Sequence, residues 1–486
     1  MLNQKILLSV LGQLLFVEAL MLAACVGVGF YYGERPMLSF GLPALLCFAL
    51  SALLIYVGRG AKASMTRRDG FLIVSVTWVV FALFGTLPFL LSGVETRFFA
   101  AFYESMSGFT TTGATALGDI DSLPRSILFW RSLMHWVGGV GIIFFTIAIL
   151  PNTNAGEQKM FSAEMTGLKI RKLHPRIRTT AHWIGGIYLT LTLCCAAALY
   201  LAGMSPFDAV NHAFSTLATG GFSTHTASIG FFADKPFVQP VLVVFMLLSG
   251  INFTLIYLFF IKHRFREVWK DGELRCFFGL LACGIVLCFS ILVLRDGRNP
   301  LEALQTAVFQ CVSVQTTTGF TSEDFMAWSN VSWIPMLALA VVGACAGSTT
   351  GGIKCVRVLT IGKIVRNEFR QLLHPHAVFH VRLGKTLIDA QVVRNIFAFL
   401  MCYILLAIVG TMILLSMNIP LLDSVSCCLT SLSNIGPGYG YIVGPTDSWG
   451  AFPDGALLLS SIYMLIGRLE IFAILLPFMP AFWQEN

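Results

Sequence analysis

A short segment rich in threonine and glycine occurs four times in this chain, and internal repetition constrains a fold more strongly than any local pattern. Three copies read SGFTTTG, STLATGGF and SVQTTTGF, and a weaker fourth copy reads TSLSNIGP. Their final glycines are about 100 residues apart and are Gly113, Gly221, Gly319 and Gly436. One copy alone would be an ordinary turn, but four copies predict a chain built from four repeats of one structural unit.

The chain also contains long apolar runs. Of its 486 residues, 56% are hydrophobic and only 12% are charged, whereas a soluble domain averages about 25% charged residues. A helix needs about 20 apolar residues to cross the hydrocarbon core of a bilayer. Ten runs meet this requirement, at residues 6–30, 38–57, 71–91, 129–150, 181–201, 240–261, 276–294, 333–364 (interrupted), 395–417 and 456–478. We therefore predict an all-α, polytopic protein embedded in a lipid bilayer.

Lysine and arginine are unevenly distributed between the connections. Most of the 32 basic residues lie at residue 5 and within residues 59–68, 159–178, 262–275 and 354–394. The positive-inside rule makes this side cytoplasmic, so both termini are expected in the cytoplasm of a multi-pass protein. The net charge of +7 is thus an orientation signal. It does not indicate nucleic-acid binding, because no basic segment carries interleaved aromatic residues that could stack on bases.

The repeated segment lies between two apolar runs each time, on the side opposite the basic connections. A stretch too short to span precedes each copy, at residues 99–109, 207–217, 301–314 and 422–432. Irregular backbone at membrane depth persists only where protein buries it or where it lines a water-filled path. A short helix entering from outside points its negative dipole end inward, and the following segment can offer carbonyl oxygens to a dehydrated cation. Glycine supplies the positive φ that turns such carbonyls inward.

Four such units around one axis would form a selectivity filter. The predicted filter residues are Thr110, Thr111, Thr112, Gly113, Ala218, Thr219, Gly220, Gly221, Thr316, Thr317, Thr318, Gly319, Ser433, Asn434, Ile435 and Gly436. The predicted organisation is a two-helix extension at 1–66, followed by outer-helix–pore-loop–inner-helix repeats around a single central pore at 67–155, 176–264, 272–372 and 390–486. The fourth copy departs most, since Asn434 and Ile435 replace threonines of the first and third copies.

These motifs resemble the Trk-type membrane subunits of the Trk/Ktr/HKT superfamily of K⁺ transporters. The resemblance covers essentially the whole chain. It is carried by GFTTTGA at 108–114, TGGFSTH at 219–225, TTTGF at 316–320, GSTTGGIK at 347–354, and the pair Gly467-Arg468. It implies K⁺ uptake across the cytoplasmic (inner) membrane, either as a channel or by symport with H⁺ or Na⁺, and not an enzyme.

The resemblance also implies ligands and partners. The implied K⁺ ligands are Thr111, Thr112, Thr219, Gly220, Thr317, Thr318, Asn434 and Ile435. The implied partners are a second copy of the chain, with one pore per subunit, and a cytosolic TrkA-like regulatory ring. No cofactor is expected in this chain, because NAD or an adenine nucleotide would bind to that ring. The basic stretches at 159–178 and 354–394 are the expected docking faces.

A glycine-rich run interrupts the eighth apolar run, and we predict that it is a gate inside the conduction path. The predicted gate residues are Gly347, Ser348, Thr349, Thr350, Gly351, Gly352, Lys354 and Arg468. The alternative for the run is a kinked, close-packed helix. Arg468 lies within the tenth apolar run, where a charge costs at least about 2.5 kcal/mol and is by default a functional candidate. Its alternative role is a structural ion pair, with Glu104 as a possible partner.

Two other functions fit an apolar chain. A secondary transporter of another small solute, with the repeats serving only as scaffold, would usually show inverted repeats and broken helices. Here all four copies have the same orientation. A membrane enzyme is disfavoured, because the apolar runs contain no H-E-x-x-H or G-x-S-x-G motif and no paired carboxylates.

Overall fold

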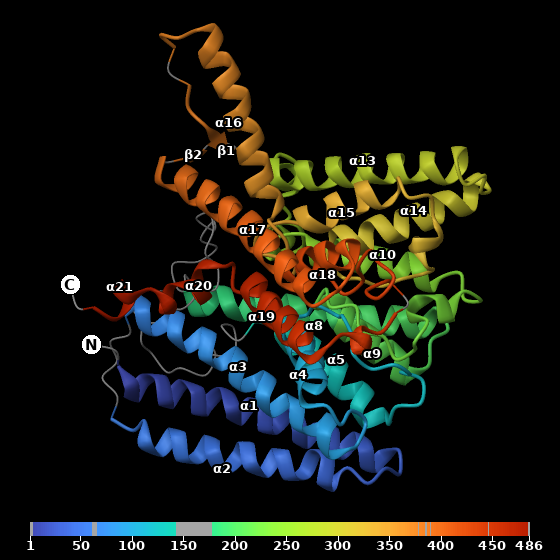
Figure 1. Cartoon of the computed structure of the whole chain (residues 1–486), viewed down its shortest axis with the longest axis vertical. Helices are drawn as coiled ribbons and strands as arrows, with labels where there is room; N and C mark the ends of the chain where they lie inside the picture. Colours follow the sequence, from blue (N-terminus) through green and yellow to red (C-terminus); the bar gives the residue numbers. More distant parts are fainter. Residues whose placement is uncertain are drawn as a thin grey trace.

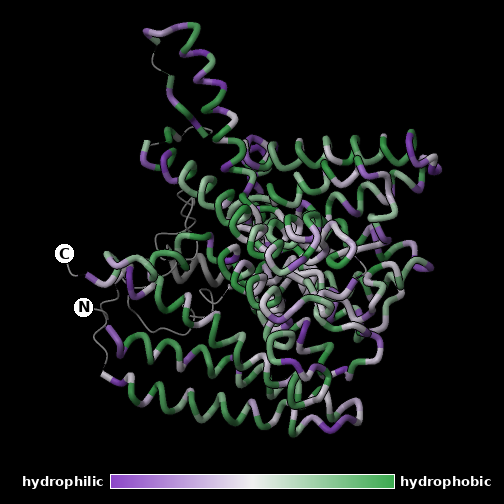
Figure 2. The backbone as a smooth tube through the Cα atoms, in the orientation of Figure 1, coloured by the Kyte–Doolittle hydropathy of each residue, from purple (hydrophilic) through white to green (hydrophobic). Residues whose placement is uncertain are grey.

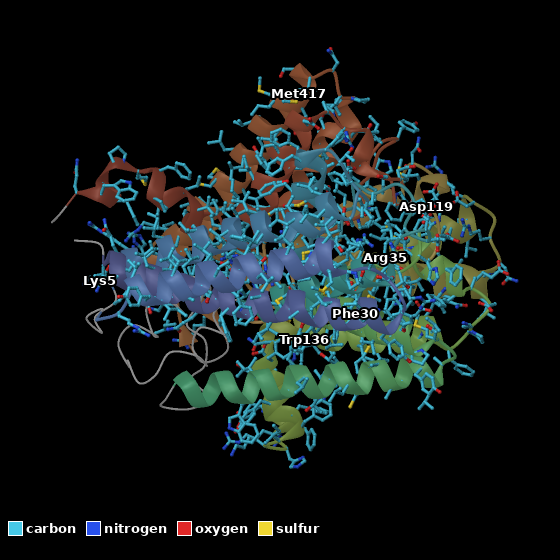
Figure 3. All side chains as sticks on the ribbon, turned by 90° about the horizontal axis from the view of Figure 1, so that it is seen from below. Lys5, Phe30, Arg35, Asp119, Trp136 and Met417 are labelled. Atoms are coloured by element: carbon cyan, nitrogen blue, oxygen red, sulfur yellow. The ribbon has the colours of Figure 1, made fainter. Side chains whose placement is uncertain are left out.

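The computed structural model is mainly helical and describes residues 3–60, 66–141, 177–377, 379–383, 386–388, 390–445 and 447–484. Its long helices run side by side, and both termini lie on the same face of the molecule (Figure 1). The long helices of the bundle are hydrophobic over most of their length, with hydrophilic residues gathered at their ends, whereas the projecting segment at 355–373 carries hydrophilic residues along its length (Figure 2). Lys5 lies at one end of this bundle, and Arg35 and Asp119 lie at the other (Figure 3).

The N-terminal extension is a pair of antiparallel helices, α1 (Gln4–Tyr31) and α2 (Leu42–Val57), joined through the π-helical turn η1 (Met37–Gly41). Small residues allow their backbones to approach closely. A Cβ atom on Gly12 would lie 2.9 Å from Ile55 Cγ1. The hydroxyl of Ser51 donates a hydrogen bond of 2.7 Å to the Gly12 carbonyl.

The remaining helices follow in four groups. The first contains α3 (Arg67–Leu91), α4 (Phe98–Phe109) and α5 (Arg125–Val140). The second contains α8 (Ile177–Leu201), α9 (Pro206–Leu217), α10 (Val238–Gly250), α11 (Phe253–Phe260) and α12 (Phe265–Trp269). The third contains α13 (Gly272–Leu294), α14 (Pro300–Gln315), α15 (Trp333–Val342) and α16 (Cys355–Leu373). The fourth contains α17 (Ala390–Ser416), α18 (Leu421–Ser433), α19 (Asp454–Arg468), α20 (Phe472–Leu475) and α21 (Pro480–Trp483).

Short elements complete the chain. Strands β1 (Arg382–Leu383) and β2 (Thr386–Leu387) form an antiparallel pair. The described residues also include the 3₁₀ turns η2 (Ser228–Phe232), η3 (Phe325–Ala327) and η4 (Trp449–Ala451), and η5 (Leu476–Phe478), which directly follows α20. Helix α16 projects away from the body of the molecule (Figure 1).

The four short helices predicted from the sequence are present as α4, α9, α14 and α18. Two of them begin at polar caps followed by proline, which suits the first helical turn because it has no N–H to satisfy. The Ser205 side chain accepts a hydrogen bond from Asp208 N at the start of α9, and Asn299 accepts one from Leu301 N at the start of α14.

Eight of the ten predicted spans are found in the described part of the chain, as six single helices and two bent pairs that are long and apolar enough to cross a membrane. The predicted run at 129–150 is described only as far as residue 141, and α5 ends at Val140. The predicted run at 333–364 is broken into α15 and α16 by twelve non-helical residues, 343–354. The alternative of a kinked helix is therefore wrong for this segment.

Two spans predicted as continuous are bent instead. Helices α10 and α11 meet at 107°, and α19 meets the segment Phe472–Phe478 at 112°. At the first bend, Ile251 is extended and Asn252 starts a new helix by accepting a hydrogen bond of 2.8 Å from Thr254 N. At the second bend, Glu470 and Ile471 both have positive φ. Arg468 thus ends a helix at a bend, and does not lie in the middle of one.

Candidate functional site

The four short helices all end in the same hydrogen-bonding pattern. In each, the residue before the final glycine donates its N–H to the carbonyl five residues back, at distances of 2.8–3.0 Å. The residue before that one donates to the carbonyl three residues back. This pair of bonds is the Schellman motif, which normally places glycine in a left-handed conformation just after the helix.

The left-handed position is not glycine in this chain. It is occupied by Thr111 (φ 54°), Thr219 (φ 55°), Thr317 (φ 53°) and Asn434 (φ 53°). Asparagine tolerates this conformation, but a β-branched threonine there is a genuine outlier. Such residues cost on the order of 1–3 kcal/mol each and gather at functional sites. The sequence pattern predicted positive φ at the glycines only, so these threonines were not expected to adopt it.

The final glycines close the four segments into a ring by direct backbone contact. A Cβ on Gly113 would lie 1.8 Å from the Gly220 carbonyl oxygen, and one on Gly221 would lie 2.1 Å from that of Thr318. A Cβ on Gly319 would lie 2.8 Å from Pro437 Cδ. One on Gly436 would lie 2.7 Å from the carbonyl carbon and oxygen of Gly113. The contacts therefore run from the first segment through the second, third and fourth and back to the first.

The fourth glycine differs from the other three. Gly113, Gly221 and Gly319 have φ of 82°, 85° and 79°, whereas Gly436 is not among the positive-φ residues. The expectation that all four glycines supply a positive φ is thus wrong for Gly436. This position requires glycine because a side chain would strike the backbone of the first segment.

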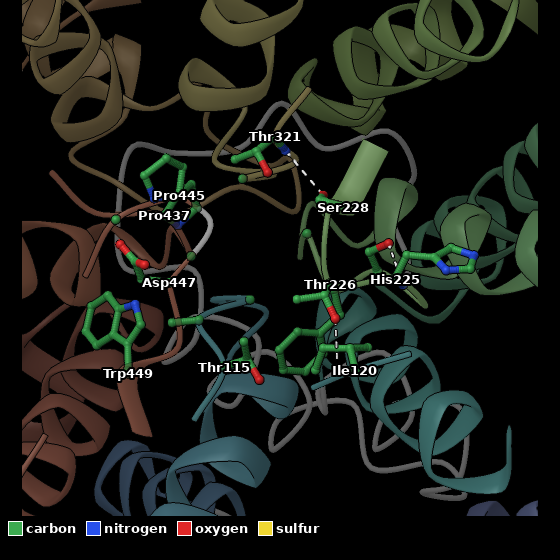
Figure 4. Close-up of a pocket in the computed structure, with 18 of the residues that line it drawn as sticks. Thr115, Ile120, His225, Thr226, Ser228, Thr321, Pro437, Pro445, Asp447 and Trp449 are labelled. Atoms are coloured by element: carbon green, nitrogen blue, oxygen red, sulfur yellow. Dashed lines mark hydrogen bonds between the residues drawn. The ribbon is translucent and has the colours of Figure 1, made fainter. Parts of the chain in front are cut away.

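The same four glycines line one vestibule that opens to solvent. Figure 4 shows residues from all four groups of helices around it, including Thr115, His225, Thr321 and Asp447. Segments that are about 100 residues apart in sequence are therefore neighbours at this mouth.

Behind the vestibule lies a set of buried carbonyl groups. The residues concerned are Thr111, Thr112, Thr219, Gly220, Thr317, Thr318, Asn434 and Ile435, and all of them are buried. No described residue donates a hydrogen bond to any of these eight carbonyl oxygens. Buried carbonyls are nearly always paired, so eight of them at the C-terminal, negative ends of four helices form a site suited to a cation.

Hydroxyl groups of the first and third segments form hydrogen bonds inside the protein. Thr110 Oγ1 donates to the Met106 carbonyl at 2.7 Å and lies 2.8 Å from Thr112 Oγ1. Thr316 and Thr318 repeat this arrangement in the third segment, with the same 2.8 Å between their hydroxyls. In the fourth segment Asn434 Nδ2 donates to Thr112 Oγ1 at 3.1 Å. The hydroxyls of Thr110, Thr112, Thr316 and Thr318 are thus paired within their own segments.

The loop at 343–354 lies directly against the ends of these helices. Thr349 Oγ1 donates to the Leu217 carbonyl at 3.1 Å, and Gly351 N donates to Thr317 Oγ1 at 2.9 Å. A Cβ on Gly351 would lie 2.0 Å from the Ser433 carbonyl oxygen. The loop therefore contacts the second, third and fourth segments at once.

Both ends of the loop are fastened. Ile353 N and Lys354 N donate to the carbonyls of Val341 and Val342, each at 2.9 Å. Ala346 N donates to Glu273 Oε1 at 2.6 Å. The ammonium group of the buried Lys354 donates to both the carbonyl and the hydroxyl of Thr350. The loop is thus an ordered structure with its own anchors.

Arg468 reaches this loop from the end of α19. Its guanidinium donates to the Thr349 carbonyl at 2.8 Å and to the Gly138 carbonyl at the end of α5. It also lies 5.8 Å from the centroid of the Trp78 ring. Arg468 therefore joins the loop to the first group of helices.

Glu104 is not the partner of Arg468. Its carboxylate is fully buried and binds Arg131 Nε at 2.7 Å. Glu470 forms an ion pair with Arg357 on α16. Arg131 was not predicted as a functional residue, although a charged residue inside the predicted run at 129–150 is a functional candidate by default.

A charged cluster lies at the outer rim of the vestibule. His225 Nδ1 is 2.7 Å from Asp121 Oδ1, and His225 Nε2 is 3.7 Å from Asp208 Oδ1. Burial disfavours the charged imidazole, but the hydrogen bonds and charges of Asp208 and Asp121 outweigh it and raise the pKa of His225. Hydrogen bonds from His225 likewise outweigh burial and lower the pKa of Asp121. The neighbouring His212 faces the same cluster from α9.

The helical bundle, the carbonyl ring and the vestibule define a multi-pass membrane protein with a candidate cation site. The family model of the TrkH cation transport proteins matches residues 40–485, and the chain belongs to this family. The resemblance seen in the sequence is confirmed. The family is one of transport proteins and not of enzymes.

Individual relatives match over nearly the full length. The Trk system potassium uptake protein TrkH of Vibrio parahaemolyticus is 37% identical over 484 residues, which is 99% of both chains. TrkG of Escherichia coli is 32% identical over 484 residues, 99% of both chains. The crystal structure of the potassium transporter TrkH from V. parahaemolyticus superimposes with a TM-score of 0.88 at 35% identity, again over 99% of both chains.

The outer cluster predicts a pH-dependent stability. Because the pKa of His225 is raised in the folded protein, its contribution is complete below its ordinary pKa of about 6.5 and is lost as the pH rises through the raised value. We expect the melting temperature of the wild type to exceed that of His225→Gln most clearly near pH 6, and the difference to shrink in alkaline solution. The exposed His374→Gln is the control. A difference that stays constant as the pH rises would contradict this role.

Proposed function

We propose that this chain carries K⁺ across a membrane through the ring formed by its four threonine- and glycine-rich segments. The observation that carries the proposal is the set of eight buried carbonyls that accept no hydrogen bond from any residue the structure describes. The relatives in the family are named as potassium uptake proteins, which supports K⁺ as the ion.

The proposed filter comprises the four segments at 110–113, 218–221, 316–319 and 433–436. Within it, the carbonyls of Thr111, Thr112, Thr219, Gly220, Thr317, Thr318, Asn434 and Ile435 would replace the hydration shell of the ion. The dipoles of α4, α9, α14 and α18 present their negative ends to the same place. Each segment has only one aligned glycine, so the carbonyl-lined stretch is short and offers few ordered ion-binding sites. We therefore expect only a modest preference for K⁺ over Na⁺.

The loop at 343–354 and Arg468 form the proposed gate. The loop contacts the second, third and fourth segments, and Arg468 donates a hydrogen bond to its Thr349 carbonyl. A fixed positive charge near a narrow path repels a cation by about 1 kcal/mol at 4 Å in water and several-fold more where water is excluded. The loop would add a steric block that moves when α16 is pulled, since α16 begins directly after Lys354.

The proposed orientation places both termini in the cytoplasm, at the inner membrane. The projecting α16 then points into the cytoplasm from the gate and exposes Phe369, Leu372 and Leu373. We propose that the basic stretch at 354–394 docks a TrkA-like nucleotide-binding ring and that the chain works as a homodimer. Most of the other expected docking stretch, 159–178, lies outside the described residues.

One observation favours a different cargo. The bends at α10–α11 and after α19 are the kind of broken helix found in secondary transporters of small solutes. Against this, neighbouring segments of the ring at the floor of the vestibule approach each other too closely to admit even a Cβ atom, which favours a dehydrated ion over an organic molecule. Uptake of ⁸⁶Rb⁺ into vesicles containing the purified protein separates the two, and saturable uptake that K⁺ inhibits supports K⁺ transport.

The backbone contacts of the ring predict a graded series of variants. We expect Gly113→Ala and Gly221→Ala to lower the discrimination between K⁺ and Na⁺ on the order of tenfold, because their Cβ atoms meet carbonyl oxygens at 1.8 and 2.1 Å. Gly319→Ala and Gly436→Ala, with contacts of 2.8 and 2.7 Å, should have smaller effects. Competition of K⁺ and Na⁺ against ⁸⁶Rb⁺ uptake measures this.

The control for the series is Gly118→Ala in the loop beyond the first segment, where a Cβ has no atom within 4 Å. It should transport like the wild type. If all four ring variants keep the wild-type competition profile, the ring is not the filter.

The gate predicts a gain of flux. Arg468→Ala removes the bond to the Thr349 carbonyl and a charge beside the path, so basal ⁸⁶Rb⁺ uptake without any partner should rise about fivefold. Deletion within residues 347–351 should act in the same direction. Uptake is normalised to monodisperse protein, and Arg370→Ala on the exposed face of α16 is the matched control. Unchanged or reduced uptake in both gate variants would exclude the gate.

A further inference from the structure

The four short helices α4, α9, α14 and α18, which we call the pore helices, share one position whose side chain, in three of them, forms hydrogen bonds with the residues after the filter segment. We call such a side chain a brace. The position lies nine residues before the final glycine and holds Glu104, His212, Gln310 and Cys427. The first three side chains contact residues that follow the final glycine of their own segment. We call these residues the filter loop. Glu104 accepts hydrogen bonds from Thr115 Oγ1 at 3.0 Å and from Ala116 N at 2.9 Å.

The second and third repeats use neutral side chains for the same contact. His212 Nδ1 faces the Asp208 carbonyl, so it carries the proton, and His212 Nε2 accepts from Ser223 Oγ at 2.9 Å. Gln310 Nε2 donates to Ser322 Oγ at 3.1 Å. In the fourth repeat the neighbouring Ser426 takes the role and accepts from Tyr439 N at 2.6 Å. Each filter loop is thus tied to its own pore helix.

The first repeat differs because its brace is charged and extends into a second repeat. Glu104 binds Arg131 Nε at 2.7 Å, and both side chains are at most 2% exposed. The other end of Arg131 donates to the Ser223 carbonyl at 3.1 Å. The ion pair therefore links pore helix α4 to the filter loop of the second repeat.

Two side chains of helix α5, Arg131 and His135, pack against Phe222 in that loop. The guanidinium of Arg131 lies 3.9 Å from the centroid of the Phe222 ring, and His135 stacks on Phe222 at 4.1 Å and 11°. Arg131 and His135 are four residues apart and so share one face of the helix. His135 Nδ1 is also 2.8 Å from Ser215 Oγ. Phe222, which directly follows Gly221, is held from both sides.

We propose that Glu104 and Arg131 are positioning residues for ion selectivity: they fix the second filter segment relative to the first. The inference rests on the proposed filter. Every cation–carbonyl distance in a ring of segments depends on how far neighbouring segments are apart. The neutral braces act within one repeat, whereas this pair acts between two.

The pair has a second consequence through its charge. Arg131 lines the vestibule through which the ion enters. Its charge is compensated by Glu104 at 2.7 Å, so the mouth does not repel cations at that point. Loss of Glu104 alone leaves a positive charge there, and loss of both charges does not. Electrostatics and positioning are therefore separable by a double variant.

The test compares Glu104→Gln, Arg131→Gln and the double variant in vesicles, with ⁸⁶Rb⁺ uptake competed by K⁺ and Na⁺. Glu104→Gln should raise the half-saturating Rb⁺ concentration and lower the K⁺ over Na⁺ discrimination, each by roughly tenfold. The double variant should recover the half-saturating concentration, because the uncompensated charge is gone, but not the discrimination, because the link is gone.

Two further variants keep the test decisive. Thr115→Val removes one hydroxyl donor to Glu104 without changing shape, and should lower discrimination in the same direction by a smaller factor even if the charge variants fail to fold. Glu323→Gln removes a carboxylate from the partly exposed outer pair with Arg298 and should leave both quantities unchanged.

The outcomes distinguish this inference from the proposed function. If the wild type shows no saturable ⁸⁶Rb⁺ uptake, the filter fails and the inference fails with it. If the wild type transports and folded Glu104→Gln, Arg131→Gln and Thr115→Val variants keep its discrimination and half-saturation, only the positioning role is overturned. Reduced uptake per molecule with an unchanged ratio would also overturn it, since that is the result of a merely structural pair.

Discussion

The contact between a glycine in one segment and a backbone carbonyl in the next is the interaction on which the rest of this structure depends. Gly113 and Gly221 approach the carbonyl oxygens of Gly220 and Thr318 more closely than any other residue could. Such contacts bring the four segments together and leave eight buried carbonyls that accept no hydrogen bond from any residue in the described part of the chain. In a membrane interior, that arrangement is tolerated only along a water-filled or ion-filled path.

This geometry requires strained backbone conformations at the helix ends. Threonines occupy left-handed backbone at three of the four helix ends, and each costs on the order of 1–3 kcal/mol. The Schellman bonds, the paired threonine hydroxyls and the braces from the pore helices offset that cost locally. The loop at 343–354 adds contacts from below, so the filter and the proposed gate share atoms. A movement of the loop would therefore change the contacts that hold the filter segments.

Much of this arrangement was predictable from the sequence. The short helices α4, α9, α14 and α18 and the loop after α15 are encoded by local signals, namely apolar length followed by threonine and glycine. The bends after Gly250 and Arg468 were not predictable, because the apolar pattern continues through them. The Glu104–Arg131 pair was missed because its two residues lie on different helices, α4 and α5, and are 27 positions apart in the sequence. The left-handed threonines were missed because local propensity argues against them and only the surrounding bonds enforce them.

Anomalous diffraction from crystals grown in Rb⁺ is the most direct measurement of whether the carbonyl ring holds the transported ion. Rb⁺ should appear on the axis between the segments, within coordination distance of the carbonyls of Thr111, Thr219, Thr317 and Asn434, and excess Na⁺ should weaken it less than excess K⁺. Well-ordered crystals with no Rb⁺ on this axis, or with Rb⁺ bound only elsewhere, would contradict an ion path through the ring.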